Sequence, residues 1–453
     1  MARSTVKDMT EGNPLRLVLG FAIPLLFGFA FQQLYSFVDT AIVGKTLGAD
    51  MLAAVGATGS VNFLILGLCN GLCAGMAIPV AQAFGAKDET ELRRNVANAA
   101  YVCVAVSLFL GSLTAALTPQ IMQLLNTDAA IIDHSVAYIR IIFAAIPITM
   151  LYNMSGGILR SLGDSKTPVT FLAVASLVNI ALDFLFILGF GMGVDGAALA
   201  TVISQLVSGV GCLTVMARRF PILHLTREDR RLRLPYCKRL VLIGIPMGLQ
   251  YSITAIGSVL ITWSVNGISV AAVAAMTAAS KISMFFCCVF DALSTTMATF
   301  AGQNIGARKV ERVGQGLLAA TKIGVVYCIG ALLVIIFFGR QMMGLFLDAA
   351  TEGEVITMAH HFIIMNGIFY IPLLFVNIVR LTIQGMGYTS IAMIAGVCEM
   401  VARAAVAIFL VPVLGFDGAC WANPAAWVAA DLFLFPCYFR LIRQVRMRFA
   451  NNR

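Results

Sequence analysis

The chain has 453 residues, of which 60% are hydrophobic and only 12% are charged, and its mean hydropathy is +0.90. A water-soluble domain is about one quarter charged, because its surface must be solvated. This composition excludes a soluble globular protein and predicts a protein of the lipid bilayer.

Apolar segments recur along the chain, and each has the roughly 20 residues that a helix needs to cross about 30 Å of hydrocarbon. Continuous spans joined by short polar turns favour helices over a barrel, whose strands would alternate over about ten residues. We therefore predict an all-α membrane protein with twelve transmembrane helices, at residues 15–43, 53–83, 95–118, 131–156, 168–190, 195–217, 239–265, 270–300, 316–338, 355–385, 391–412 and 417–441.

The net charge of +9 is unevenly distributed. Lys and Arg cluster near 87–94, 218–239, 308–312 and 440–453, in alternate loops, whereas the opposite loops contain little beyond Lys45 and Arg340. This positive-inside pattern predicts a multi-pass membrane protein with both termini in the cytoplasm. It also argues against a nucleic-acid partner. The first 13 residues are too polar for a cleaved signal peptide, so we expect the first helix to stay in the membrane.

Short motifs of the first half recur in the second half at an almost constant spacing. AIP (22–24) returns as GIP (244–246), and QAFGAK (82–87) returns as QNIGAR (303–308). GVDGAA (193–198) and GFDGAC (415–420) form a third such pair. Six helices per half is an even number, so we predict two lobes related by a pseudo-two-fold axis along the membrane normal.

The expected parts are an N-terminal lobe (1–217), a cytoplasmic linker (218–238) and a C-terminal lobe with a basic tail (239–453). Prolines repeat as well, with Pro24 and Pro246 in helices one and seven and Pro147 and Pro372 in helices four and ten. They predict either static kinks or bends that change as the protein works.

Polar residues form stripes on three otherwise apolar helices. At helical spacing these are Gln32, Tyr35 and Asp39 on the first helix, Ser176, Asn179 and Asp183 on the fifth, and Thr201 and Gln205 on the sixth. Such residues can simply hydrogen-bond helices together. An aspartate in the middle of a span costs about 2.5–3.5 kcal/mol, however, so Asp39 and Asp183 point to the loading and release of a proton or a sodium ion.

The second half lacks these acids. By the repeat, Asp39 corresponds to about Ile261, and Asp183 to the apolar stretch Ala404–Ala407. Ion coupling is therefore expected in the first half only. The remaining intramembrane charges are expected to pair structurally: Glu399 with Arg403 at i, i+4, and Lys281, Asp291, Arg380 and Asp431 between helices.

Several of these segments resemble one known family. MTEGNPLRLVLGFAIPLLFGFAFQQLYSFVDTAIVG, VGAT with QAFGAK, and GGILRSLGDSKTP (156–168) are similar to the MATE (multidrug and toxic compound extrusion) transporters. The resemblance implies an exporter of organic cations and amphipathic drugs that works by proton or sodium antiport and alternating access. It implies no enzymatic activity, no cofactor besides the coupling ion, and a monomer whose partners are drug-like cations and membrane lipids.

The family's prokaryotic DinF-like branch has a cation site of two Asp, one Asn and one Thr on helices one, five and six. The matching residues are Asp39, Asn179, Asp183 and Thr201, which would also be the sodium ligands if sodium is the coupling ion. The adjoining substrate pocket is expected to include Gln32, Tyr35, Asn153, Ser176 and Gln205. Helices seven and ten contain none of the acids found in other branches, which favours the DinF-like assignment.

Other functions are less compatible with the sequence. A lipid-linked saccharide flippase of the wider superfamily, the main alternative, should carry several basic residues in its cavity for pyrophosphate. A membrane-embedded transferase needs an acid or His cluster at a membrane surface, but the four histidines are scattered apart from one adjacent pair.

Overall fold

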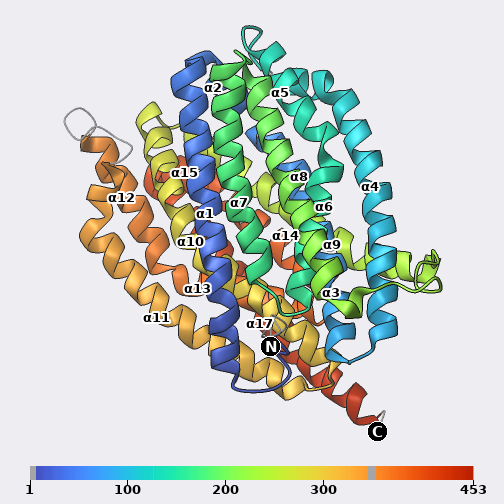
Figure 1. The fold of residues 1–453 in the computed structure, drawn as a ribbon. Helices are drawn as coiled ribbons and strands as arrows, with labels where there is room; N and C mark the ends of the chain where they lie inside the picture. The colour runs from blue at the N-terminus through green and yellow to red at the C-terminus, as the bar shows by residue number, and fades with distance from the viewer. Residues whose placement is uncertain (1–6, 126, 345–352, 452–453) are drawn as a thin grey trace. The chain divides into compact units, whose positions relative to one another are not determined.

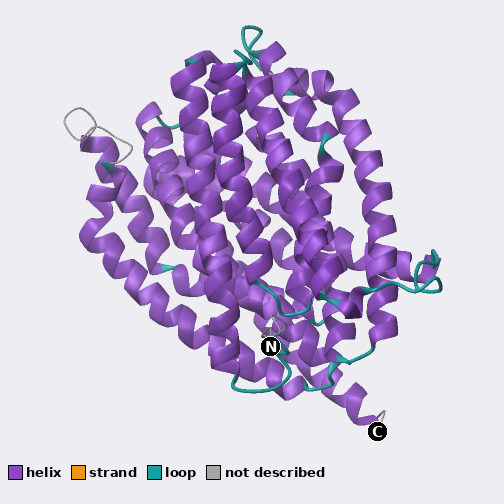
Figure 2. Cartoon of the chain, in the orientation of Figure 1, coloured by secondary structure: helices purple, strands orange, loops and turns teal. Residues whose placement is uncertain are grey.

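The computed structural model describes residues 7–125, 127–344 and 353–451, and within these ranges the chain forms helices and connecting loops without a strand (Figure 2). Figure 1 labels the helices in chain order. By its internal contacts the chain separates into two compact units. Unit 1 comprises Phe27–Ser252 together with residues 7 and 8, and unit 2 comprises Met9–Leu26 and the chain from Ile253 onward.

Unit 1 contains most of α1 and the helices that follow it. Their bounds are α1 Pro14–Leu47, α2 Ala49–Ala57, α3 Gly59–Gly85, α4 Glu89–Leu124, α5 Ile132–Ala144, α6 Ile146–Ser161, α7 Lys166–Asp183, the π-helical turn η1 Phe184–Gly189, α8 Val194–Arg219, the 3-10 turn η2 Pro221–Leu223, and the first part of α9 Leu234–Asn266. The packing of α6, α7 and α8 against one another brings the stripes of the fifth and sixth predicted helices together.

Unit 2 contains the start of α1, the end of α9, and the remaining helices. These are α10 Val270–Gly306, α11 Val310–Met343, α12 Gly353–Ile368, α13 Tyr370–Gly385, α14 Thr389–Ala405, the π-helical turn η3 Val406–Leu410, α15 Val411–Leu414, α16 Phe416–Cys420 and α17 Ala422–Asn451. The predicted lobes 1–217 and 239–453 and linker 218–238 follow the sequence repeat, whereas the compact units divide α1 and α9 instead.

Ten helices within the described ranges are long and apolar enough to cross a bilayer, and two pairs of shorter helices reach that length together. The pairs are α5 with α6, bent by 46°, and α12 with α13, bent by 52°. Counting each pair as one span gives twelve, so the predicted all-α membrane fold with twelve helices is confirmed. Pro147 and Pro372 lie in the first turn after the two breaks, because proline has no N–H to continue the helical hydrogen bonds.

The sequence repeat is visible in the backbone of both units. The π-helical turn η1 begins directly after Asp183, and η3 begins directly after Ala405, within the stretch that corresponds to Asp183 by the repeat. Lys87 and Arg308, at the ends of the repeated QAFGAK and QNIGAR motifs, have φ values of 57° and 58°. A positive φ is uncommon for a residue other than glycine, so the two halves share an unusual backbone conformation as well as the sequence motif.

The backbones of α3 and α9 approach very closely within unit 1. A Cβ atom at Gly71 would lie 2.5 Å from the carbonyl oxygen of Met247 and 2.7 Å from Cα of Gly248. A Cβ at Gly75 would lie 2.6 Å from Cα of Gly244. Glycines four residues apart on both helices permit this contact, which fixes the first part of α9 against α3.

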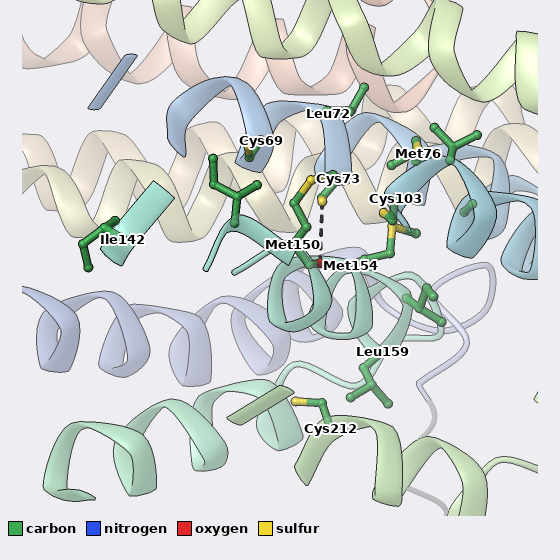
Figure 3. Close-up of a cluster of buried hydrophobic side chains, with 14 of the residues drawn as sticks. Cys69, Leu72, Cys73, Met76, Cys103, Ile142, Met150, Met154, Leu159 and Cys212 are labelled. Atoms are coloured by element: carbon green, nitrogen blue, oxygen red, sulfur yellow. Dashed lines mark hydrogen bonds between the residues drawn. The ribbon is translucent and has the colours of Figure 1, made fainter. Parts of the chain in front are cut away.

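Sulfur-containing and aliphatic side chains form the core of unit 1 (Figure 3). Cys73 on α3 lies at its centre, and its thiol donates a hydrogen bond to the carbonyl oxygen of Met150 on α6 (3.8 Å). All eleven cysteines are free thiols. The buried ones act as small packing residues, which suits helices that must approach closely.

Candidate functional site

The three polar stripes come from α1, α7 and α8, and all lie in unit 1. Asp183 is the last residue of α7, directly before the π-helical turn η1. Asn179 and Asp183 are fully buried, whereas Asp39 on α1 and Thr201 on α8 are partly exposed. Four residues that are far apart in the sequence thus contribute to one neighbourhood.

The carboxyl groups of Asp39 and Asp183 lie within hydrogen-bonding reach of each other. An ionised carboxylate only accepts hydrogen bonds, so two carboxyl groups at this separation need a proton or another cation between them. Two unscreened negative charges at this separation would repel strongly in a poorly solvated site. The pair is therefore built to hold a proton or another cation between two acids.

Asn179 connects the acid pair to α8. In the amide orientation that satisfies both neighbours, its nitrogen donates to Oδ2 of Asp183 (2.9 Å) and its oxygen accepts from the backbone N–H of Thr201 (3.1 Å). The Thr201 hydroxyl donates to the carbonyl oxygen of Ala197 (3.1 Å) and lies within hydrogen-bonding reach of the Tyr35 phenol. The four predicted cation-site residues therefore form one connected group.

One oxygen of each acid has no donor. Oδ1 of Asp39 and Oδ1 of Asp183 are buried and have no hydrogen-bond partner among the described residues. A buried polar atom without a partner costs about 1–3 kcal/mol, so a cation bound at these two oxygens would lower the free energy of the site. Sodium is a hard cation that prefers oxygen ligands, and the carboxylate, amide and hydroxyl oxygens of these four residues match that preference.

A pocket of about 170 Å³ adjoins this site in unit 1. All five predicted pocket residues line it: Gln32, Tyr35, Asn153, Ser176 and Gln205. Tyr35 belongs to both the pocket and the cation site, since its hydroxyl reaches Thr201. Pockets that enclose a drug-sized molecule begin at roughly 300 Å³, so this smaller one accommodates one part of such a molecule.

Sequence reasoning missed several residues of the pocket wall. They are Leu66, Asn70, Thr149, Tyr152, Leu172, Ala175, Ser204 and Ser208. Asn153 donates to the side-chain oxygen of Asn70 (2.6 Å), and Thr149 donates to that of Gln205 (2.6 Å). The spacing of Thr149, Tyr152 and Asn153 at i, i+3 and i+4 was the available signal. Tyr138 on α5 was also missed: it is buried and lies within electrostatic range of both acids.

The chain was compared with known protein families. The sequence model of the MatE family matches residues 24–185 and 246–409, which together make up well over half of the chain. The chain belongs to the MatE family. The two matched segments begin at Pro24 and Pro246, the prolines of the repeated AIP and GIP motifs, so the family model follows the internal repeat.

Individual relatives agree with membership of the MatE family. The chain is 30% identical over 355 residues to a Bacillus subtilis (strain 168) protein named a probable multidrug resistance protein, YoeA, covering 76% of each sequence. It is 25% identical over 392 residues to an FAD transporter of Shewanella oneidensis, covering 85% of each. A solved structure described as the outward-facing conformation of a multidrug resistance MATE family transporter shares the fold, with a TM-score of 0.90, 23% identity and coverage of 99% of this chain and 100% of that one.

The second half of this MatE chain has no corresponding acid pair within the described part of unit 2. Ile261, the counterpart of Asp39, is a buried apolar residue. Glu399 on α14 instead accepts hydrogen bonds from Arg380 on α13 and from Arg403 (3.4 Å for the latter). The predicted Glu399–Arg403 pair is confirmed, and Arg380 is its additional member.

The expected pairing between helices is confirmed for Arg380, which pairs with Glu399 on α14, but within the described ranges not for Lys281 and Asp291. Asp431 on α17 lies within electrostatic range of Arg380. Lys281 and Asp291 are both exposed residues of α10 and form no ion pair within the described ranges. Ten residues of helix separate them by about 15 Å, which is too far for contact with each other.

Proposed function

We propose that the chain is a secondary active multidrug exporter, working as a monomer in the bacterial cytoplasmic membrane with both termini inside. It exports organic cations and other amphipathic drugs in exchange for protons or sodium ions, by alternating access. The observation that carries this proposal is the contact between Asp39 and Asp183 beside a pocket that Tyr35 shares with the cation site. The name of the Bacillus relative supports drugs as the substrate class.

The exchange follows from the charge of the acid pair. When the coupling ion leaves, the carboxylates repel each other, and the positive charge of a bound drug compensates them. When an ion returns from outside, it neutralises the pair and removes the attraction for the drug.

A lipid-linked saccharide flippase is the main alternative. Recognition of a pyrophosphate requires several basic groups in the binding cavity. The residues that line the described pocket include no Lys or Arg. This lining favours cationic substrates.

The test uses purified protein in lipid vesicles, with proton and sodium gradients imposed separately and uptake of a fluorescent organic cation as the readout. We expect one of the two gradients to drive uptake by the wild type, and Asp39→Asn to reduce it at least tenfold. Asp50→Asn is the matched control, because Asp50 is exposed on α2. Equal uptake by Asp39→Asn and wild type, at equal protein content, would remove the acid pair from the mechanism.

A second measurement addresses the pair itself. Drug binding in detergent should release the coupling ion from the wild type and release less from Asp183→Asn. The same release from both proteins would show that Asp183 is structural and that Asp39 works without it.

A further inference from the structure

A second cavity of unit 1, with a volume of about 410 Å³, lies on the opposite side of α6 from the pocket beside the acid pair. Thr149 and Asn153 line that pocket from one face of α6, whereas Met150, Met154 and Ile158 line the second cavity from the other face. Its remaining walls come from α4, from α8 and from the first part of the linker. The two cavities are therefore separate sites that share one helix.

This second cavity is an apolar groove that opens toward the surroundings of the protein. Cys103, Met150 and Met154 are buried at its floor (Figure 3), whereas Val104 and Leu108 at its rim are 57% and 56% exposed. No charged side chain lines the groove. Methionine adapts to irregular apolar shapes, and ligand sites begin at roughly 300 Å³, so the groove is suited to a flexible hydrocarbon ligand.

The length of the groove matches one leaflet of a bilayer. It follows α4 from Val96 to Leu108, a rise of about 18 Å. One leaflet contributes about 15 Å of hydrocarbon, half of the roughly 30 Å of the whole bilayer. Ala217, near the end of α8, and Leu225 of the linker line the groove at the end that we propose to be cytoplasmic. The groove thus has the position and the length of an acyl chain of the cytoplasmic leaflet.

The linker folds back over this end of the groove. Nε2 of His224 lies 3.0 Å from the carbonyl oxygen of Ala217. The Tyr101 hydroxyl, on α4, donates to the carbonyl oxygen of Arg230 (2.6 Å). These two contacts hold the linker against the ends of both helices that form the groove, so its arginines lie close to the groove entrance.

The positive charge at this entrance is largely uncompensated. Five exposed arginines form no ion pair within the described ranges, namely Arg218, Arg219, Arg227, Arg230 and Arg231. The neighbouring acids Glu228 and Asp229 pair with other arginines, Arg233 (3.6 Å) and Arg93 (3.0 Å). Clusters of about four to eight basic residues directly beyond a membrane helix attract anionic headgroups. Apolar groove and basic entrance together match the two parts of an anionic phospholipid.

We propose that this groove binds one acyl chain of an anionic phospholipid from the cytoplasmic leaflet, and that the arginines between residues 218 and 231 bind its phosphate. The bound chain packs against the face of α6 that is turned away from Thr149 and Asn153. It therefore supports the helix that forms one wall of the polar pocket. A neutral phospholipid supplies the same chain without the negative charge, so it binds more weakly.

The first test compares dioleoyl-phosphatidylglycerol with dioleoyl-phosphatidylcholine, whose acyl chains are identical. Binding of each to the detergent-solubilised protein is measured by native mass spectrometry, and we expect the wild type to prefer phosphatidylglycerol. Arg227→Gln combined with Arg230→Gln should weaken phosphatidylglycerol binding roughly 10- to 30-fold, because each basic residue near an anionic headgroup contributes about fivefold. Arg227→Lys combined with Arg230→Lys keeps both charges and should preserve binding.

The second test blocks the groove itself. Ala100 lines the groove and is exposed, so the ring of Ala100→Phe can enter the groove without displacing the core. Binding of both lipids should fall at least roughly tenfold, because each methylene kept out of an apolar site costs about fourfold in affinity. Ala116→Phe is the matched control: Ala116 is exposed on the same helix but does not line the groove, so lipid binding should be unchanged.

Three outcomes would overturn the proposal. Equal affinity of the wild type for the two lipids would exclude selection of an anionic headgroup, and an equal loss in the Gln and Lys double variants would indicate a structural role for these arginines. Wild-type lipid affinity in Ala100→Phe, with loss of a bound fluorescent organic cation, would show that the groove takes drugs instead. Binding is measured without an ion gradient, so these results do not depend on the proposed export function.

Discussion

The close contact between α3 and α9 predicts that a single methyl group at Gly71 destabilises the protein. In Gly71→Ala the new Cβ would meet backbone atoms of Met247 and Gly248 at 2.5–2.7 Å. Favourable contacts between heavy atoms lie near 3.5–4.0 Å, so the helices must separate by roughly 1 Å. Backbone atoms cannot rotate away as a side chain does, and overpacking of this kind costs about 1–3 kcal/mol.

The net effect includes the higher helix propensity of alanine, about 1 kcal/mol, which offsets part of the cost. We expect Gly71→Ala to lower the free energy of unfolding by up to about 2 kcal/mol, and the melting temperature in detergent by up to roughly 4–8 °C for a cooperative unit of this size. The assay is thermal unfolding of the purified protein, followed by intrinsic fluorescence and by loss of the monodisperse peak.

Gly330→Ala is the matched control for this substitution. Gly330 is an exposed residue of α11, and a Cβ atom there would meet no atom within 4 Å. The same change of residue should therefore raise the melting temperature slightly through helix propensity alone. If both variants shift the melting temperature by the same amount and in the same direction, the contact between α3 and α9 does not limit stability.

Three further outcomes follow from the geometry. The Asp164 carboxylate accepts hydrogen bonds from the backbone N–H groups of Lys166 and Thr167 (3.0 Å each) and so stabilises the start of α7. Asp164→Ala should lower the free energy of unfolding by about 1–2 kcal/mol, measured by thermal unfolding, and Asp164→Asn should lower it less. Glu399→Gln should lower the free energy of unfolding by roughly 3–5 kcal/mol, because the two buried arginines that pair with Glu399 lose their negative partner. The expected observation is a poor yield of folded protein, and a yield equal to that of the wild type would contradict this reasoning. Hydrogen bonds from Thr226 lower the pKa of Asp229. The ionised Asp229 carboxylate therefore stabilises the folded loop fully above the unfolded-state pKa of about 3.9, and this stabilisation is lost as pH falls through the lower folded-state pKa. Proteolysis of the 224–233 loop should increase over that acidic window in the wild type, and Asp229→Asn should abolish this pH dependence.

Helix spacing was sufficient to predict the residues that gather at the acid pair. Asp39 and Asp183 are exceptional in apolar spans, and their stripes have a period that only a helix explains, so their convergence followed once α1, α7 and α8 were placed side by side. The contacts that join them were beyond a single sequence. The amide of Asn179 bridging to a backbone N–H of α8 depends on where the π-helical turn begins, and no residue type signals that turn.

Residues that act through long-range packing were not predictable in this way. Arg160 belongs to the recognisable GGILRSLGDSKTP motif, but no sequence pattern predicts that its side chain folds back over Gly156 on α6. Tyr138 reaches the acids only because the span containing α5 and α6 is bent. The glycines of α3 and α9 could not be singled out from the sequence, since glycine is common in membrane helices. Their role in close helix packing is recognised only when the partner helix is known.

The division of α1 and α9 between the two compact units has a consequence for how such a chain originates. Each half of the sequence gives the start of its first helix to the other unit: Met9–Leu26 belongs to unit 2, and the start of α9 belongs to unit 1. A single six-helix copy therefore lacks a segment that its own core requires. In unit 1 that segment is the start of α9, whose backbone packs against Gly71 and Gly75 of α3. Two identical copies would complete each other by exchanging that segment, which is the arrangement of a domain-swapped dimer. Fusion of two such copies makes the exchange permanent, and the present chain has the topology that this fusion would leave.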